Sequence, residues 1–425
     1  MPEGSVHDEI SSFEQFHAAT FSVVAIRRKR TMRIAVDGRT IVRSKSGVGT
    51  YVERTMRALL KIDKHNEYFL FLVEPLESLE APNLRKILIP GYDKALRNRF
   101  WDSILLPMFA ERERIDIIFG AAYALPLLPR WGKFVKALPI PSSWKVPFNP
   151  ARTVKYIAAI LDVIGFVRPE TFTPKMRLWQ HIFVSNAVKI ADTIITISES
   201  TKRDIVKLFG FDAAKIYVTP LSVDEQYRPH HSAAQRKHVR ATYSLPPQFM
   251  LYVGTIEPRK NVTGIAKAYS LLPPDLRHKF PLVIAGSRGW YADTIFEEIA
   301  LLSIAENIKE IGFVDGRDLP TLVSLARLFV FPSLYEGFGY PPLEAMASGV
   351  PVISSTTSSL PEVVGDAGIL VDPDDYKGMS AAMRRILTDN KLRAHLIAKG
   401  IQRAKKFSGQ QTAERTLKAF QATLG

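Results

Sequence analysis

The amino-acid sequence predicts an α/β fold with two domains, each built on a parallel sheet covered by helices on both sides. Its 425 residues are 46% hydrophobic and 23% charged, which is a globular composition long enough for two domains. Short apolar runs of strand length alternate with helical stretches along most of the chain, as in parallel sheets. The clearest unit runs from Arg327 to Ser354, where two apolar runs flank a short helical segment in a βαβ arrangement.

Residues 1–31 form a separate segment before the first domain. They are mostly polar and end in the apolar stretch Phe21–Ile26, followed by the basic run Arg27–Arg30. The apolar part is too short and in the wrong order for a signal peptide. We therefore expect an extended start or a mobile arm, and the basic run could equally make a weak membrane contact.

The first domain, expected over residues 32–227, contains seven strand-like runs. In order they are Met32–Gly38, Glu67–Val73, Lys86–Ile89, Asp116–Gly120, Val154–Asp162, Asp192–Ser198 and Lys215–Leu221. After the first run, Gly47 and Gly49 form a partial G-x-G loop that leads into a helical pattern. A plain tight turn explains these glycines nearly as well. Between Pro126 and Pro150 the pattern breaks into Pro, Trp and Lys, which indicates a surface loop or a separate binding lobe.

The positive charge belongs mainly to the first half of the chain. Residues 1–240 hold 37 Lys and Arg against 24 Asp and Glu (+13), whereas residues 241–425 hold 20 against 18 (+2). Residues 81–160 alone carry 13 basic and 5 acidic side chains. The aromatic residues interleaved with them are Phe100, Trp101, Trp131, Phe134 and Trp144. This pattern suits an anionic membrane surface or a phosphorylated lipid, with a solvated basic face as the simpler alternative. No nucleic-acid-binding module is recognisable, so we expect no nucleic-acid partner.

The composition also excludes several kinds of site. Without cysteine, the chain has no disulfide, no thiolate metal site and no Cys nucleophile. No apolar run reaches the roughly 18 residues of a membrane span, so we expect a cytoplasmic protein that is soluble or peripheral to the membrane. The adjacent His230 and His231 lie in residues 228–248, the expected linker, without a correctly spaced partner for a metal.

The second domain, expected over residues 249–407, opens with a strand at Phe249–Thr255. The segment Glu257-Pro-Arg259-Lys260-Asn261 follows directly and precedes a helix. A forked Arg beside a Lys at the carboxyl end of a strand suits a diphosphate. Alone, however, such a pair is more often merely solvated.

Two carboxylates bracket the loop that follows the strand-like run ending at Pro332. Glu336 lies at the mouth of this loop, and Glu344 lies in the first turn of a helix expected at Pro342–Ser348. Gly337 and Gly339 let the backbone approach a ligand closely. A carboxylate could hold vicinal sugar hydroxyls. The alternative is that Glu344 only complements the helix dipole and Glu336 is solvated.

The whole string from Glu336 to Val352 resembles the E-x7-E signature of the retaining GT-B glycosyltransferases of family 4, which include many bacterial mannosyltransferases. The resemblance implies two Rossmann-like domains facing across a cleft, with a C-terminal helix at 408–425 crossing back to the first domain. It makes Glu336 the residue that contacts the transferred sugar and Glu344 the residue that holds the nucleotide ribose. The loop formed by Gly337, Phe338 and Gly339 would face the diphosphate.

Other segments resemble the same family. Glu257–Asn261 is similar to its E-x-R-K-N motif, so Arg259 and Lys260 would stabilise the departing diphosphate without a metal or another cofactor. By the same resemblance, Gly254 at the end of the opening strand and Val314 at the base-binding edge belong to the nucleotide-sugar site. Gly47 and Gly49 would lie near the donor phosphates and the acceptor. We interpret Asp372-Pro-Asp374, which mimics a D-x-D metal motif, as a turn.

One position departs from the family pattern. The run Ile157–Val163 resembles a strand that usually ends in His-Asp, but this chain has Leu161 before Asp162. Asp162 therefore remains a candidate catalytic residue, and no catalytic His is assigned.

The resemblance implies transfer of a hexose from a nucleotide-diphosphate sugar, with GDP-mannose favoured and UDP-hexoses close behind. The expected acceptor is a saccharide or a polyprenyl-diphosphate-linked saccharide in surface polysaccharide synthesis, such as O-antigen or exopolysaccharide. Two alternatives are a GT-B nucleotide-sugar epimerase and a non-catalytic nucleotide-sugar-binding subunit, for which Leu161 is the only sequence indication.

Overall fold

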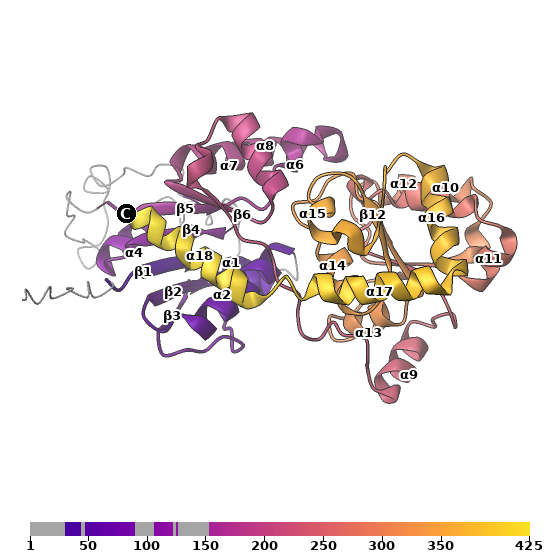
Figure 1. The fold of residues 1–425 in the computed structure, drawn as a ribbon. Coiled ribbons are helices and arrows are strands. Elements are labelled where there is room, and N and C mark those ends of the chain that lie inside the picture. Colours follow the sequence, from indigo (N-terminus) through magenta and orange to yellow (C-terminus); the bar gives the residue numbers. More distant parts are fainter. Residues whose placement is uncertain (1–29, 44–46, 90–105, 122–124, 126–152) are drawn as a thin grey trace, which may run out of the picture. The chain divides into compact units, whose positions relative to one another are not determined.

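The computed structural model of this protein describes residues 30–43, 47–89, 106–121, 125 and 153–425 (Figure 1). Residues 32–425 form one compact unit. Nearly all of the N-terminal extension, the five aromatic residues interleaved with the basic region, and the irregular stretch at 126–150 lie outside the described residues.

The first sheet has seven strands in the order β3-β2-β1-β4-β5-β6-β7, and every pair is parallel. Its strands are β1 Arg33–Asp37, β2 Glu67–Leu72, β3 Leu84–Leu88, β4 Ile117–Gly120, β5 Lys155–Ala159, β6 Thr193–Thr196 and β7 Ile216–Val218. Each of them overlaps one of the seven strand-like runs of the first domain.

The second sheet has six strands, again all parallel, in the order β10-β9-β8-β11-β12-β13. Its strands are β8 Met250–Val253, β9 Leu282–Ala285, β10 Ile308–Gly312, β11 Leu328–Phe331, β12 Val352–Ser355 and β13 Ile369–Val371. The four residues of β11 are completely buried, which explains why the strand reads as a continuous apolar run. The two parallel sheets confirm the predicted fold class.

Helices connect the strands and cover both sheets. In and around the first sheet they are α1 Arg39–Arg43, α2 Gly47–Ile62, α4 Leu106–Arg112, α6 Ile164–Val167, α7 Pro174–Ile190 and α8 Glu199–Phe209. In and around the second they are α9 Ala233–Thr242, α10 Val262–Ser270, α11 Pro274–Lys279, α12 Ala292–Ala300, α13 Leu319–Ser324, α14 Tyr340–Ala347, α15 Leu360–Val364, α16 Tyr376–Thr388 and α17 Asn390–Ala404.

The last helix, α18 Gly409–Leu424, returns to the first sheet, as the resemblance implied (Figure 1). The Thr412 hydroxyl donates to the Pro220 carbonyl at 2.7 Å, and the Thr423 hydroxyl donates to that of Thr193 at 2.8 Å. Phe420 packs edge-on against a phenylalanine of β4, with ring centroids 5.4 Å apart. The C-terminus is thus fixed to the first sheet by buried polar and aromatic contacts.

Three local expectations differ from the structure. Gly47 and Gly49 lie in the first turn of α2 rather than in an open loop. Helix α14 begins at Tyr340, so Glu344 lies in its second turn and not its first. The expected linker contains α9, whose N-terminus is closed by a capping box between Ser232 and Gln235.

Candidate functional site

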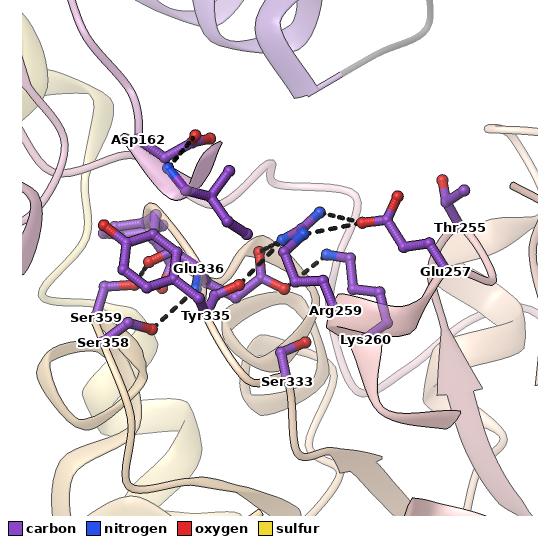
Figure 2. Close-up of polar contacts among 12 residues, drawn as sticks. Asp162, Thr255, Glu257, Arg259, Lys260, Ser333, Tyr335, Glu336, Ser358 and Ser359 are labelled. Atoms are coloured by element: carbon purple, nitrogen blue, oxygen red, sulfur yellow. Dashed lines mark hydrogen bonds and ion pairs between the residues drawn. The ribbon is translucent and has the colours of Figure 1, made fainter. Parts of the chain in front are cut away.

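Arg259, Lys260 and Glu336 meet at the carboxyl ends of β8 and β11 (Figure 2). The Nη1 atom of Arg259 donates to Glu336 Oε2 at 2.7 Å, and Lys260 Nζ donates to Glu336 Oε1 at 2.6 Å. Each oxygen of the Glu336 carboxylate therefore accepts a hydrogen bond from one cationic side chain. Because β8 and β11 are hydrogen-bonded parallel neighbours, the segments that follow them emerge side by side. The structure thus brings together three residues that the family resemblance assigned to the sugar and the diphosphate of one donor.

A one-turn 3₁₀ helix at Pro258–Lys260 positions the two cations. Asn261 ends it in the left-handed conformation, with φ of 56°, and its side chain then caps α10 by accepting from the Gly264 N–H. The Asn261 amide group also donates to the Pro373 carbonyl at 2.9 Å. The turn that carries Arg259 and Lys260 is thereby fixed from both sides.

Glu257 is a buried second carboxylate beside Arg259. The Nε atom of Arg259 donates to Glu257 Oε1 at 2.9 Å, and Arg259 Nη1 also donates to the Tyr335 carbonyl at 3.1 Å. Arg259 is therefore held in one orientation by three groups. Glu257 belongs to the E-x-R-K-N motif, but the only sequence signal for a contact with Arg259 is its position two residues earlier.

The electrostatics of the cluster favour an ionised Glu336. Burial alone would raise the pKa of Glu336, but Arg259 and Lys260 outweigh burial and lower that pKa to about 2. Burial and the neighbouring Arg259 lower the pKa of Lys260, whereas the carboxylates raise the pKa of Arg259 despite its burial. The two cations face two carboxylates, because Glu336 contacts both of them and Glu257 contacts Arg259, so their attraction for a further anion becomes available when Glu336 is displaced.

Two serines hold the loop after Glu336. The Glu336 N–H donates to Ser358 Oγ at 2.8 Å, and Ser359 Oγ lies 2.8 Å from the Glu336 carbonyl and 2.6 Å from the Phe338 carbonyl. Both serines precede α15, next to β12. The loop that contains Gly337 and Phe338 is therefore tied to the neighbouring βα turn, while Gly339 is the residue before α14.

Asp162 approaches the same loop from the end of β5 in the first sheet (Figure 2). A Cβ at Gly337 would overlap the Leu161 carbonyl oxygen and lie 3.1 Å from the Asp162 Cβ, so only glycine fits there. Asp162 Oδ1 accepts from the Gln180 side chain at 3.1 Å. Burial raises the pKa of Asp162, and the charge of Arg259 partly opposes this. Gln180, on α7, had no local sequence signal.

Glu344 lies in a different set of contacts. Its Oε1 is 3.5 Å from Arg54 Nη2, and the Arg54 guanidinium also lies over the Tyr340 ring, 4.9 Å from its centroid. Burial raises the pKa of Glu344, which Arg54 and a hydrogen bond with Tyr227 partly oppose. The sequence did not indicate Arg54, because 290 residues separate it from Glu344.

The remaining predicted residues occupy varied positions. Gly47 is exposed and Gly49 is buried in α2. Gly254 follows β8 and donates its N–H to the Ala285 carbonyl at 3.0 Å. Val314 is buried in the core, whereas the adjacent Phe313 is exposed.

Asp372 to Asp374 form the expected turn, with the Asp374 N–H donating to Asp372 Oδ1 at 2.9 Å. Within the described residues, no three His, Asp or Glu side chains gather as metal ligands would.

Comparison with known proteins supplies the context for this geometry. The profile of the family described as Glycosyltransferase Family 4 matches residues 45–227, and that of Glycosyl transferases group 1 matches residues 236–403. The chain is 38% identical over 275 residues to O-antigen chain mannosyltransferase B of Escherichia coli, covering 64% of this chain and 72% of that protein.

Two further proteins extend the comparison. Over 238 residues the chain is 34% identical to the serotype-specific mannosyltransferase WbdA of Escherichia coli, which covers 54% of this chain but only 29% of that longer protein. The structure superimposes on sucrose-phosphate synthase from Thermosynechococcus elongatus with a TM-score of 0.69 and 19% identity, covering 92% of this chain and 99% of that one. The last likeness concerns the fold alone.

Proposed function

Because this chain belongs to the family 4 glycosyltransferases of the GT-B fold, we propose that it transfers mannose from GDP-mannose, with retention of configuration, to a saccharide acceptor. The names of its mannosyltransferase relatives favour mannose, and UDP-hexoses are the other donors to test. In this proposal residues 32–227 bind the acceptor and residues 249–407 bind the nucleotide sugar, with 228–248 between them.

The single observation that carries the proposal is the contact of Glu336 with both Arg259 and Lys260. A diphosphate offers these cations negatively charged oxygen atoms, as the Glu336 carboxylate does. When the diphosphate occupies the cations, Glu336 is released to accept hydrogen bonds from sugar hydroxyls. The three residues then contact adjacent parts of one donor molecule.

The chemistry follows from where charge develops. As the bond between the sugar and the diphosphate breaks, negative charge grows on the leaving diphosphate, and Arg259 and Lys260 stabilise it without reorganising. The amides at Gly337 to Gly339 and the start of α14 supply further positive potential. The acceptor hydroxyl attacks from the face the diphosphate leaves and passes its proton to the departing diphosphate, while ionised Asp162 beside the transferred sugar stabilises the positive charge that develops there. No step in this scheme requires a metal ion.

The acceptor is proposed to be a polyprenyl-diphosphate-linked saccharide of a surface polysaccharide such as O-antigen. The relatives' names support this class, and the positive charge of the first half of the chain suits a phosphorylated lipid. Such an acceptor would place the protein at the cytoplasmic face of the membrane.

Donor identity is tested by incubating the protein with GDP-mannose or UDP-hexoses and a lipid-linked acceptor, and analysing products by mass spectrometry. We expect the acceptor mass to increase by one hexose with GDP-mannose. Arg259→Ala and Glu336→Ala should each lower turnover by about 10²-fold or more, the scale of one lost charged contact in a dry site. Turnover near that of the wild type in either variant would contradict the site assignment, and isomerised donor without transfer would indicate an epimerase.

A further inference from the structure

Tyr335, the residue before Glu336, connects the site to helix α8. Its hydroxyl donates to Asp204 Oδ2 on α8 at 2.6 Å, and its carbonyl accepts from Arg259 Nη1 at 3.1 Å. Tyr335 is only 4% exposed. Burial and the Asp204 carboxylate raise the pKa of Tyr335, so the hydroxyl keeps its proton and acts as the donor. Tyr335 therefore ties α8 to both the loop of Glu336 and the guanidinium of Arg259.

Helix α8 also contacts the chain beside Asp162. The Thr201 hydroxyl on α8 donates to the Leu161 carbonyl in a longer contact of 3.4 Å, and Leu161 immediately precedes Asp162. Thr201 and Asp204 are three residues apart, so they project from the same side of the helix. One side of α8 therefore contacts the residues that precede both carboxylates proposed to lie against the sugar.

Glu362, on α15, holds the first turn of α8. Its Oε2 accepts from the Glu199 N–H at 2.8 Å, and its Oε1 accepts from the Ser200 N–H at 2.6 Å. The Ser198 side chain accepts from the Thr201 N–H. These two side chains satisfy three of the N–H groups that the first turn of a helix leaves without a helical partner. The charge of Glu362 also complements the positive end of the helix dipole.

We infer that Asp204 and Glu362 are positioning residues, which act through α8 to set the distance between the two carboxylates proposed to lie against the sugar. Asp204 acts on the Glu336 side through the Tyr335 hydroxyl. Glu362 fixes the turn from which α8 reaches both sides. The inference rests on the proposed function, since it assigns both residues to sugar transfer. A misplacement of 1 Å can lower a rate by about 10²-fold, so a smaller shift of α8 should lower kcat by about tenfold.

The test is Tyr335→Phe, which removes the hydroxyl that contacts Asp204 and keeps the ring and the carbonyl. We expect kcat for transfer from GDP-mannose to fall about tenfold. The Kd of GDP should change by less than about threefold, because ionic attraction depends on distance far less steeply than the alignment of reacting atoms does. The matched control is Tyr68→Phe. The buried Tyr68 hydroxyl also donates to an aspartate, Asp63, at 2.6 Å, but at the amino end of β2. Its kcat should stay within about twofold of the wild type.

Further variants test whether the side chains act as inferred. The double variant Tyr335→Phe/Asp204→Ala should have a kcat within about twofold of Tyr335→Phe, because both changes remove the same hydrogen bond. Glu362→Ala should lower kcat about tenfold and speed amide hydrogen exchange in the first turn of α8. Glu362→Gln should recover part of both losses, because its amide oxygen still accepts one N–H group. Thermal unfolding of each variant checks that it folds.

Each other outcome overturns the inference. A wild-type kcat in Tyr335→Phe or in Glu362→Ala would remove that residue from the transfer step while leaving the proposed function standing. Equal loss of kcat in Tyr68→Phe would mean that lost stability, and not lost position, lowers the rate. A double variant whose kcat falls by the product of the single effects would show that the two side chains do not act through one bond. Absence of transfer by the wild-type protein with every donor would instead refute the proposed function, and the positioning role with it.

Discussion

Replacing Glu336 by Gln should tighten the binding of a free nucleoside diphosphate while removing most of the turnover. In the structure both oxygens of Glu336 occupy the cations proposed to bind the diphosphate, so the ligand must displace the carboxylate. A neutral amide of the same size competes far less for Arg259 and Lys260. Free GDP carries no sugar, so its affinity reports this competition separately from any contact of Glu336 with the sugar.

The magnitude follows from the pKa of Glu336, which the two cations lower from 4.5 to about 2. A difference of about 2.5 pKa units corresponds to about 3 kcal/mol in favour of the ionised carboxylate. The lowered pKa of Lys260 indicates that the contact with Glu336 stabilises the Lys260 ammonium by less than this, because Lys260 is buried beside Arg259 and shares the Glu336 carboxylate with it. We therefore take the free energy obtained from the pKa of Glu336, which faces two cations, as an upper limit for the cost of displacing the carboxylate. If Glu336→Gln removed this cost completely, the Kd of GDP would fall about a hundredfold, and we expect it to fall at least tenfold.

Isothermal titration calorimetry with GDP and with UDP at pH 7 measures this change, and steady-state transfer assays measure turnover. The matched control is Glu67→Gln, which breaks a half-exposed ion pair with Arg33 at the amino ends of β2 and β1, the edge of the sheet opposite the carboxyl ends. The control should leave both affinity and turnover unchanged. Equal or weaker GDP binding by Glu336→Gln would refute the reasoning, since it would mean that the carboxylate does not compete for the cations.

The remaining predictions concern the loop, the aspartate and acid stability. Gly337→Ala should lower turnover at least tenfold and lower the Tm, because the added Cβ would overlap the Leu161 carbonyl oxygen. The control is Gly316→Ala, which should behave like the wild type because its Cβ meets nothing within 4 Å. Asp162→Asn should lower kcat about tenfold or more and flatten the acidic limb of the pH–rate profile. Burial raises the pKa of Asp162, and only its ionised form is proposed to act. An acidic limb that is unchanged in the variant would contradict this role. Glu336→Gln should be less stable than the wild type by about 3 kcal/mol at pH 7 in urea unfolding. That difference in unfolding free energy should shrink as pH falls below 4.5 and vanish near 2, because a carboxylate with a lowered pKa contributes stability only while it is ionised. A difference that does not depend on pH would exclude the ion pairs of Glu336 as its source.

The sequence by itself determined the strands, the fold class and the main motif residues. Strands such as β11 are buried on both faces, and this burial requires an unbroken apolar run that is visible without a structure. The convergence of Arg259 and Lys260 on Glu336 was predictable for a related reason. Each motif directly follows a strand of one parallel sheet, and carboxyl ends of neighbouring strands share an edge.

Only the tertiary structure decided which other side chains complete the site. Glu344 contacts Arg54 across 290 residues of sequence, and Asp162 is held by Gln180 from α7. Neither contact leaves a periodic or local pattern, because each depends on how separately folded elements pack together.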